Sequence, residues 1–183
     1  MGEIRTERLV LREYREGDAA RISEIANNKK IANNMVDTFP YPFLLEDVEK
    51  WAKIVSNSEN CDKNFVVVFE GEIIGGVGFK LEEGFREGVV AGGFWFGEDY
   101  WGRGFATEVL NAIVDYIFEN FDVRRISAGT FSWNSSAAKV LKKCGFSKEG
   151  CRENAVIRFG KVCDEYLYGL LKCEWEVLND RID

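Results

Sequence analysis

A glycine turn between an apolar strand and a helix is the segment of this chain best suited to chemistry. Residues 91–119 read AGGFWFGEDYWGRGFATEVLNAIVDYIFE, with Gly102, Arg103 and Gly104 at the junction. Such a turn leaves backbone N–H groups unpaired at a helix N-terminus, where the positive end of the helix dipole favours phosphate oxygens. The pattern predicts a diphosphate site, although a tight turn that binds nothing has the same signature.

A second motif follows downstream. Residues 134–146 read NSSAAKVLKKCGF, which is typical of a short helix with Asn134 as its N-cap and Gly145 at its end. Two motifs in this order favour a ligand site more than the turn alone. A Rossmann domain is the competing interpretation, but Thr107 occupies its third glycine position and several strands precede the turn, so we expect a different fold.

Four segments together resemble the GNAT acetyltransferase superfamily, most closely the branch that includes the ribosomal-protein alanine N-acetyltransferases. They are TERLVLR at 6–12, YWGRGFATE at 100–108, the 134–146 segment and LLKCEW at 170–175. The resemblance covers nearly the whole chain. It implies a single domain over residues 1–183, with an α/β fold whose mixed, mostly antiparallel sheet of about seven strands is flanked by helices on both faces.

The resemblance also implies the cofactor and the residues that hold it. In this superfamily the glycine turn binds the pyrophosphate of acetyl-CoA through backbone amides, and the pantetheine arm follows the preceding strand. Trp101 stands where the superfamily has Gln or Arg. Asn134 fits a helix cap and a cofactor contact equally well, and Lys139 fits a solvated face or the 3′-phosphate. The implied cofactor-binding residues are Phe94, Trp95, Phe96, Trp101, Gly102, Arg103, Gly104, Phe105, Ala106, Thr107, Asn134 and Lys139.

The candidate catalytic groups are Phe96, Ser136 and Glu98. The backbone N–H of Phe96 would polarise the thioester carbonyl. Many relatives carry a glutamate at the position of Ala91 and a serine at that of Ala137, and both side chains are absent here. Ser136 would substitute only if the helix start rotates, and Glu98 either holds a water or solvates the turn.

The absence of these two side chains affects which acceptor amine is expected. Freeing an α-amine of pKa about 8 at pH 7 costs roughly 1.4 kcal/mol, whereas an amine near 10.4 costs roughly 4.6 kcal/mol. We therefore expect direct attack by a protein or peptide N-terminal α-amine. A polyamine or aminoglycoside acetyltransferase and a non-catalytic acyl-CoA-binding domain stay open as alternatives.

Composition narrows the function classes. The chain has 183 residues, 46% of them hydrophobic, and a formal net charge of −7, which disfavours nucleic acid and anionic membranes as partners and weakly favours cationic acceptors. It contains no histidine, which excludes Ser-His-Asp and Cys-His hydrolases.

Five cysteines without a C-x-x-C pair predict no metal site, and Cys144 reads as a packed thiol rather than a nucleophile. We expect a cytoplasmic protein without a membrane span, either a monomer or a homodimer.

Periodicity and turn residues predict the elements that place these motifs. Glycines at 75, 76, 78, 92 and 93 lie inside predicted strands, where they mark a bulge, a close approach or simple tolerance. The expected strands are 4–12, a hairpin over 64–80 that turns at Gly71, 88–96, 123–131, 146–152 and 161–171, and the expected helices are 17–28, 45–58, the one after the glycine turn and the one after Asn134.

Overall fold

The computed structural model describes residues 2–56 and 63–180. Its eight strands follow the order β1-β2-β3-β4-β5-β6-β8-β7. The pairs β1–β2, β2–β3, β3–β4, β6–β8 and β7–β8 are antiparallel, and the pair β5–β6 is parallel. The expected mixed, mostly antiparallel sheet is confirmed, with eight strands where about seven were predicted. Contacts divide the chain into two compact units, residues 1–79 with 94–109 and residues 80–93 with 110–183.

The first unit begins with a short hairpin instead of the single strand predicted over residues 4–12. Strands β1 (Ile4–Arg5) and β2 (Leu9–Glu13) pair antiparallel. Thr6 closes the turn between them, since its N–H donates to the Leu9 carbonyl at 3.0 Å and its hydroxyl accepts from the Leu9 N–H at 3.0 Å. These local bonds interrupt the extended pattern, which alternation alone did not reveal.

The predicted hairpin over residues 64–80 is confirmed. Strands β3 (Lys63–Phe69) and β4 (Glu72–Leu81) pair antiparallel around Gly71, whose φ is +85°. A Cβ built on Gly75 would lie 2.3 Å from the carbonyl oxygen of Trp95, which belongs to strand β5 (Val89–Phe96). Gly75 therefore permits close approach of the protein's own backbone, because a side chain there would collide with it.

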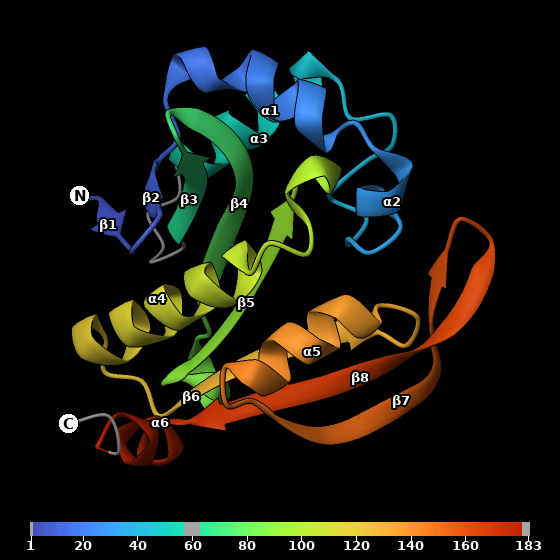
Figure 1. The fold of residues 1–183 in the computed structure, drawn as a ribbon. Helices are drawn as coiled ribbons and strands as arrows, with labels where there is room; N and C mark the ends of the chain where they lie inside the picture. The colour runs from blue at the N-terminus through green and yellow to red at the C-terminus, as the bar shows by residue number, and fades with distance from the viewer. Residues whose placement is uncertain (1, 57–62, 181–183) are drawn as a thin grey trace. The chain divides into compact units, whose positions relative to one another are not determined.

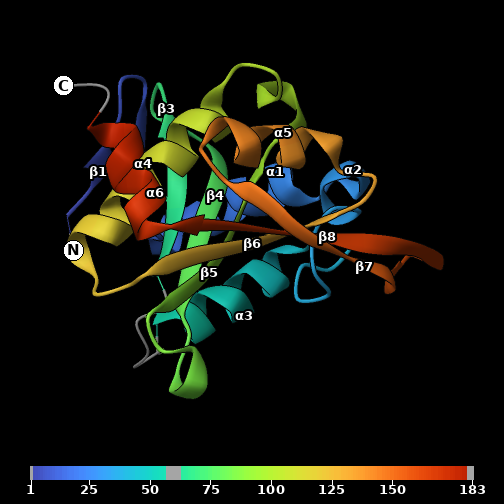
Figure 2. The ribbon, with the colours of Figure 1, turned by 90° about the horizontal axis from the view of Figure 1, so that it is seen from below.

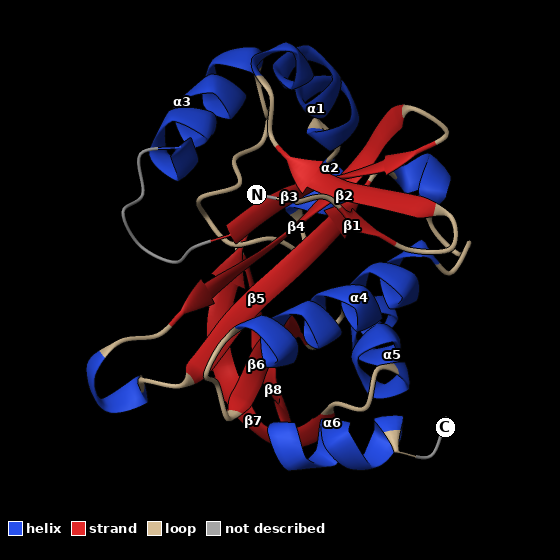
Figure 3. Cartoon of the chain, turned by 90° about the vertical axis from the view of Figure 1, so that its left-hand side faces the viewer, coloured by secondary structure: helices blue, strands red, loops and turns tan. Residues whose placement is uncertain are grey.

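Three helices cover one face of these strands. Figures 1 and 3 show α1 (Ala19–Ala26) beside α3 (Leu45–Ser56), and α2 (Lys29–Ala32) follows α1 after an Asn28 cap. Helix α2 was not predicted, and residues 57–58 of the predicted 45–58 helix lie outside the described part. The buried cluster consists of Ala19, Ile22, Ala26, Ile31, Ala32, Phe39, Phe43, Val48, Val66 and Ile73.

The other face of β3 packs against the start of α4 (Phe105–Asn120). The ring centroids of Phe69 and Phe105 are 4.8 Å apart. Val68, which precedes Phe69, packs on the opposite side against the α1–α3 cluster, as alternation along a strand requires. The first unit therefore has helices on both faces of its strands.

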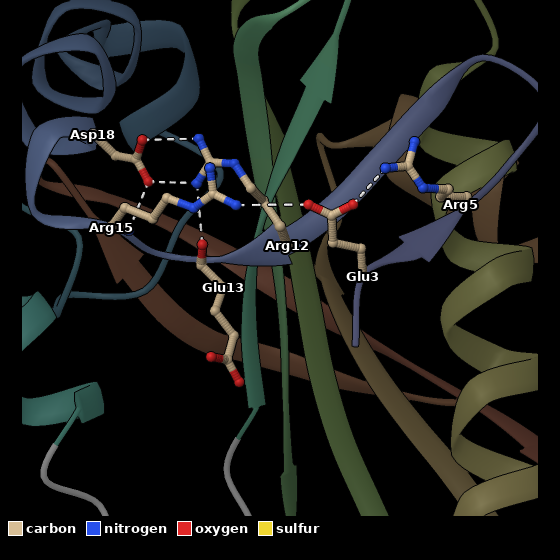
Figure 4. A network of polar contacts seen from close by, with 6 residues as sticks. All are labelled: Glu3, Arg5, Arg12, Glu13, Arg15 and Asp18. Carbon is tan, nitrogen blue, oxygen red and sulfur yellow. Dashed lines mark hydrogen bonds and ion pairs between the residues drawn. The ribbon is translucent and has the colours of Figure 1, made fainter. Parts of the chain in front are cut away.

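A polar network ties β2 to the first helical turn, η1 (Glu16–Asp18), as Figure 4 shows. Arg12 donates two hydrogen bonds to the Asp18 carboxylate, at 2.7 and 2.9 Å, and the Arg15 N–H donates a third at 2.7 Å. The side chains of Arg12 and Asp18 are largely buried, with 14% and 10% of their surfaces exposed. A bidentate pair in this setting holds the α1 entry against β2.

The second unit contains the β7–β8 hairpin, strand β6 and residues 89–93 of β5. Strand β8 (Lys161–Leu171) pairs antiparallel with β7 (Ser147–Arg158) on one side and with β6 (Arg125–Phe131) on the other. Helix α5 (Ser135–Lys143) contacts β7, and Figure 1 shows it running along this layer. The strands predicted near 123–131, 146–152 and 161–171 are confirmed, with β7 longer than expected.

The chain's last described helix, α6 (Lys172–Asn179), packs beside α4 in Figure 2. The rings of Phe118 and Trp175 are 5.3 Å apart, and the Trp175 indole donates to the Asp115 carboxylate at 2.7 Å. This helix was not predicted. No helix in residues 2–56 and 63–180 is long and apolar enough to cross a bilayer.

Candidate active site

Strand β5 carries an exposed glycine pair. Its parallel pairing with β6 covers Val89–Ala91 against Arg125–Ser127, although β5 continues to Phe96 and β6 to Phe131. Gly92 and Gly93 are exposed, and no described atom lies within 4 Å of a Cβ built on Gly93. A strand segment without side chains can offer its backbone N–H and C=O groups to an extended ligand.

The end of β5 is fixed to the residues that follow it. Phe96 is buried, and its carbonyl accepts a hydrogen bond of 2.7 Å from the Trp101 indole. The Gly97 N–H donates to the Ile74 carbonyl of β4 at 2.9 Å. Trp101, at the position where the superfamily has Gln or Arg, therefore joins the glycine turn to the strand. Phe94 and Trp95 are half-buried.

The glycine turn opens α4 with two left-handed residues. Gly102 has a φ of +74° and Gly104 a φ of +84°, a region that glycine occupies without strain. The Gly104 carbonyl accepts from the N–H groups of Thr107 and Glu108, each at 3.1 Å, which starts the helix. The predicted strand, turn and helix are therefore contiguous as expected.

The turn presents a row of backbone donors. No backbone carbonyl in the described chain accepts from the amides of Gly102, Arg103 or Gly104. Phe105 and Ala106 are the first two residues of α4, whose initial amides have no partner within the helix. Adjacent amides at the positive end of a helix dipole suit an anion with several oxygens, such as a diphosphate.

Arg103 adds a cation to this turn. Its guanidinium carbon lies 4.8 Å from the centre of the Phe105 ring and 5.0 Å from that of Phe69, so the side chain rests on aromatic faces. None of the ion pairs among the described residues uses Arg103, whose side chain is exposed. Backbone amides and a guanidinium without an ion-pair partner among those residues together suit a diphosphate group.

Glu98 lies on the short helix η3 (Glu98–Tyr100), just before the turn. Its carboxylate accepts from the Asn28 side chain at 2.8 Å and from the Lys30 ammonium. The hydrogen bond from Lys30, followed by that from Asn28, lowers the pKa of Glu98 below its ordinary value. A carboxylate with a lowered pKa is a weak proton acceptor. Neither Asn28 nor Lys30 was predicted from the sequence as a partner of Glu98.

The remaining candidates belong to the second unit. Asn134 caps α5, because its side-chain oxygen accepts from the Ala137 N–H at 3.1 Å, while Ser136 and Lys139 are exposed on that helix. Within the described residues, the buried Thr130 hydroxyl and Trp133 indole nitrogen have no hydrogen-bond partner. Thr130 and Trp133 are close to Asn134 in the sequence, so this segment has two buried polar atoms without a hydrogen bond among the described residues. The catalytic and cofactor-binding roles of all these residues stay predictions.

Two other chemistries receive no support here. Burial raises the pKa of the Cys144 thiol to about 11, so it is protonated at neutral pH, where a thiolate is needed for nucleophilic attack. Among the described residues, no group of three or more Cys, Asp and Glu side chains could hold a metal ion.

Comparison with known proteins gives one consistent result. Residues 8–147 match the model of the acetyltransferase (GNAT) domain. The uncharacterised N-acetyltransferase p20 of Bacillus licheniformis is 28% identical over 177 residues, which cover 96% of this chain and 99% of the relative.

Crystal structures agree with this chain in fold. The ribosomal-protein-S5-alanine acetyltransferase of Vibrio fischeri superposes with a TM-score of 0.80 and 25% identity, covering 96% of this chain and 99% of the other. The spermidine N-acetyltransferase of Vibrio cholerae, in complex with CoA and spermine, gives 0.79 and 23%, covering 92% and 98%.

Proposed function

Because the chain belongs to the GNAT acetyltransferase family and is an N-acetyltransferase, we propose that it acetylates the α-amino group of a protein or peptide by direct attack of that amine. The observation that carries the cofactor assignment is the glycine turn, with its row of amides and the exposed Arg103. Acetyl-CoA supplies the acetyl group as an activated thioester.

The residues present fit this cofactor. The amides of residues 102–106 and the Arg103 guanidinium would hold the diphosphate, and the backbone of Phe94–Phe96 would orient the pantetheine arm. Asn134 and Lys139 are the further proposed contacts. The N–H of Phe96 would polarise the acetyl carbonyl, an effect that preorganised donors supply without moving.

The choice of an α-amine follows from the weakness of the available bases. Ala91 and Ala137 carry no ionisable group, Ser136 is exposed, and Glu98 has a lowered pKa because Lys30 and Asn28 hold its charged form. An α-amine of pKa about 8 is already partly neutral at pH 7, whereas lysine and polyamine amines near 10 are almost wholly charged. The α-amine thus needs the least help in losing its proton, which passes to water.

Relatives support both a protein and a small-molecule acceptor. One structure similar to this chain is named as an acetyltransferase of a ribosomal protein's alanine, and another as an acetyltransferase of spermidine. The proton argument favours the first class, and the acceptor experiment decides between them.

The test measures CoA thiol release from acetyl-CoA with three acceptor pools, each from about pH 6.5 to about pH 9, a range that spans the α-amine pKa. The pools are peptides with small N-terminal residues, polyamines and aminoglycosides, and the control is the same peptides with blocked N-termini. We expect release with free peptides, rising up to the pKa of the α-amine and then levelling. A preference for polyamines or aminoglycosides contradicts the α-amine proposal, and binding of CoA without release in any pool favours a non-catalytic domain.

A further inference from the structure

Glu108, on the first turn of α4, is held by the β1–β2 hairpin and not by its own helix. Its carboxylate accepts from the Thr6 hydroxyl, from the Arg8 backbone N–H at 2.9 Å and from the Arg8 Nε at 2.7 Å. The Arg8 Nη2 lies 2.7 Å from the same carboxylate, which is only 15% exposed. Four donors from one hairpin therefore converge on a single side chain.

Arg8 extends this contact into the glycine turn. Its Nη1 donates to the carbonyl of Arg103 at 3.1 Å, and its guanidinium carbon lies 4.6 Å from the centre of the Phe105 ring. A Cβ built on Gly104 would be 3.4 Å from the Arg8 Nη2. Arg8 thus contacts Arg103 and Phe105 and lies beside Gly104, and its planar fork spans the turn carbonyl and the carboxylate at once.

This arrangement affects a bound anion in two ways. Holding the Arg103 carbonyl fixes that peptide plane, and with it the direction of the adjoining Gly104 N–H. A glutamate in the first turn of a helix commonly turns back toward the unpaired amides, where it would compete with a ligand anion. Here both oxygens of Glu108 are engaged by Thr6 and Arg8, and the Arg8 charge offsets that of Glu108.

We propose that Arg8, anchored by Glu108, is a positioning residue for the glycine turn, and that it sets the affinity of the turn for the diphosphate of acetyl-CoA. This inference rests on the proposed function of the turn. Arg8 acts through the peptide of Arg103 and is not a catalytic residue.

The test compares Arg8→Met with Arg5→Met in the full chain. Met keeps much of the arginine stem but cannot hold the Arg103 carbonyl or Glu108, so we expect the KM for acetyl-CoA to rise about tenfold, with kcat at saturation within about twofold of the wild type. Arg5 lies on the same hairpin, its side chain is 70% exposed and it pairs with Glu3, so its replacement should leave both constants unchanged.

Arg8→Lys separates positioning from charge and is the variant to use should Arg8→Met fail to fold. Lysine keeps an ion pair with Glu108 but cannot also bridge to the Arg103 carbonyl, so the KM should still rise, by about threefold. An unchanged KM in Arg8→Lys overturns the positioning role, as does a lower melting temperature in Arg8→Met with an unchanged KM.

Calorimetric titration of the wild type with CoA keeps the two proposals distinguishable. Absence of CoA binding in the wild type overturns the proposed function and this inference with it. Binding that is equal in the wild type and Arg8→Met leaves the proposed function standing and overturns the inference alone.

Discussion

At the scale of single residues, the sharpest question is whether the left-handed glycines of the turn serve a ligand or only the chain reversal. Replacing Gly104, whose φ is +84°, with alanine should cost about 1 kcal/mol of stability because an L side chain is disfavoured in this region. If the amides bind diphosphate, the shifted backbone should also raise the KM for acetyl-CoA about tenfold.

Gly71→Ala is the matched control for this change. Gly71 has nearly the same φ, +85°, and no described atom lies within 4 Å of its built Cβ, but it sits in the β3–β4 turn. Both variants should lose similar melting temperature, and only Gly104→Ala should lose CoA affinity. Equal KM values in the two variants would remove the turn from the cofactor site.

A second residue-scale prediction concerns Asp18. Burial alone would raise the pKa of Asp18, but the hydrogen bonds from Arg12 and Arg15 outweigh it and lower the pKa below its ordinary value. The unfolded chain therefore binds a proton at higher pH than the folded one, so the free energy of unfolding falls as the pH drops below about 4.

Asp18→Asn should remove about 3 kcal/mol of stability at neutral pH, because it leaves the largely buried Arg12 without a carboxylate. Urea unfolding measures this loss. The difference in the free energy of unfolding between variant and wild type should narrow as the pH falls through the pKa of Asp18 in the folded protein. Glu3→Gln, on an exposed pair with Arg5, should cost less than about 1 kcal/mol. A gap that stays constant down to about pH 3 would mean that the Asp18 charge contributes nothing.

At the scale of elements, the position of β5 depends on glycines in β4. In Gly75→Ala the added Cβ would lie 2.3 Å from the Trp95 carbonyl oxygen and 3.0 Å from the Phe96 Cα, both backbone atoms that cannot rotate away. We expect a loss of about 3 kcal/mol in urea unfolding, together with reduced turnover because β5 shifts. Gly17→Ala is the control, since nothing described lies within 4 Å there. Equal stability of the two variants would show that β4 and β5 can separate freely.

Elements with strong periodic patterns were predictable from sequence, and short elements fixed by capping were not. The β3–β4 hairpin, α4 and α5 follow alternation, helical spacing and the Asn134 cap. Helix α2 has only four residues, too few to show a period, and depends on Asn28 accepting from the Lys30 N–H at 2.8 Å. The split between β1 and β2 likewise depends on the hydrogen bonds between Thr6 and Leu9.

At the scale of the whole molecule, the turn was predictable but its supports were not. The glycine spacing between an apolar strand and a helix locates residues 102–107 at a helix N-terminus. In the structure Glu108 contacts Arg8, which lies 100 positions earlier in the chain. Contacts between distant residues leave no periodic trace in a single sequence, so Arg8 and Lys30 entered the site only through the structure.

The last prediction concerns the net charge, −7 from 31 acidic and 24 basic residues. If this charge attracts cationic acceptors, two peptides with the same N-terminal residue should respond oppositely to salt. When the salt concentration is raised from about 0.02 M to about 0.3 M, the KM of a peptide with lysines at its second and third positions should rise. The KM of the counterpart peptide with glutamates at those positions should fall, because screening weakens attraction and repulsion alike. Both are measured at saturating acetyl-CoA, and a common salt response would show that the acidic surface does not steer the acceptor.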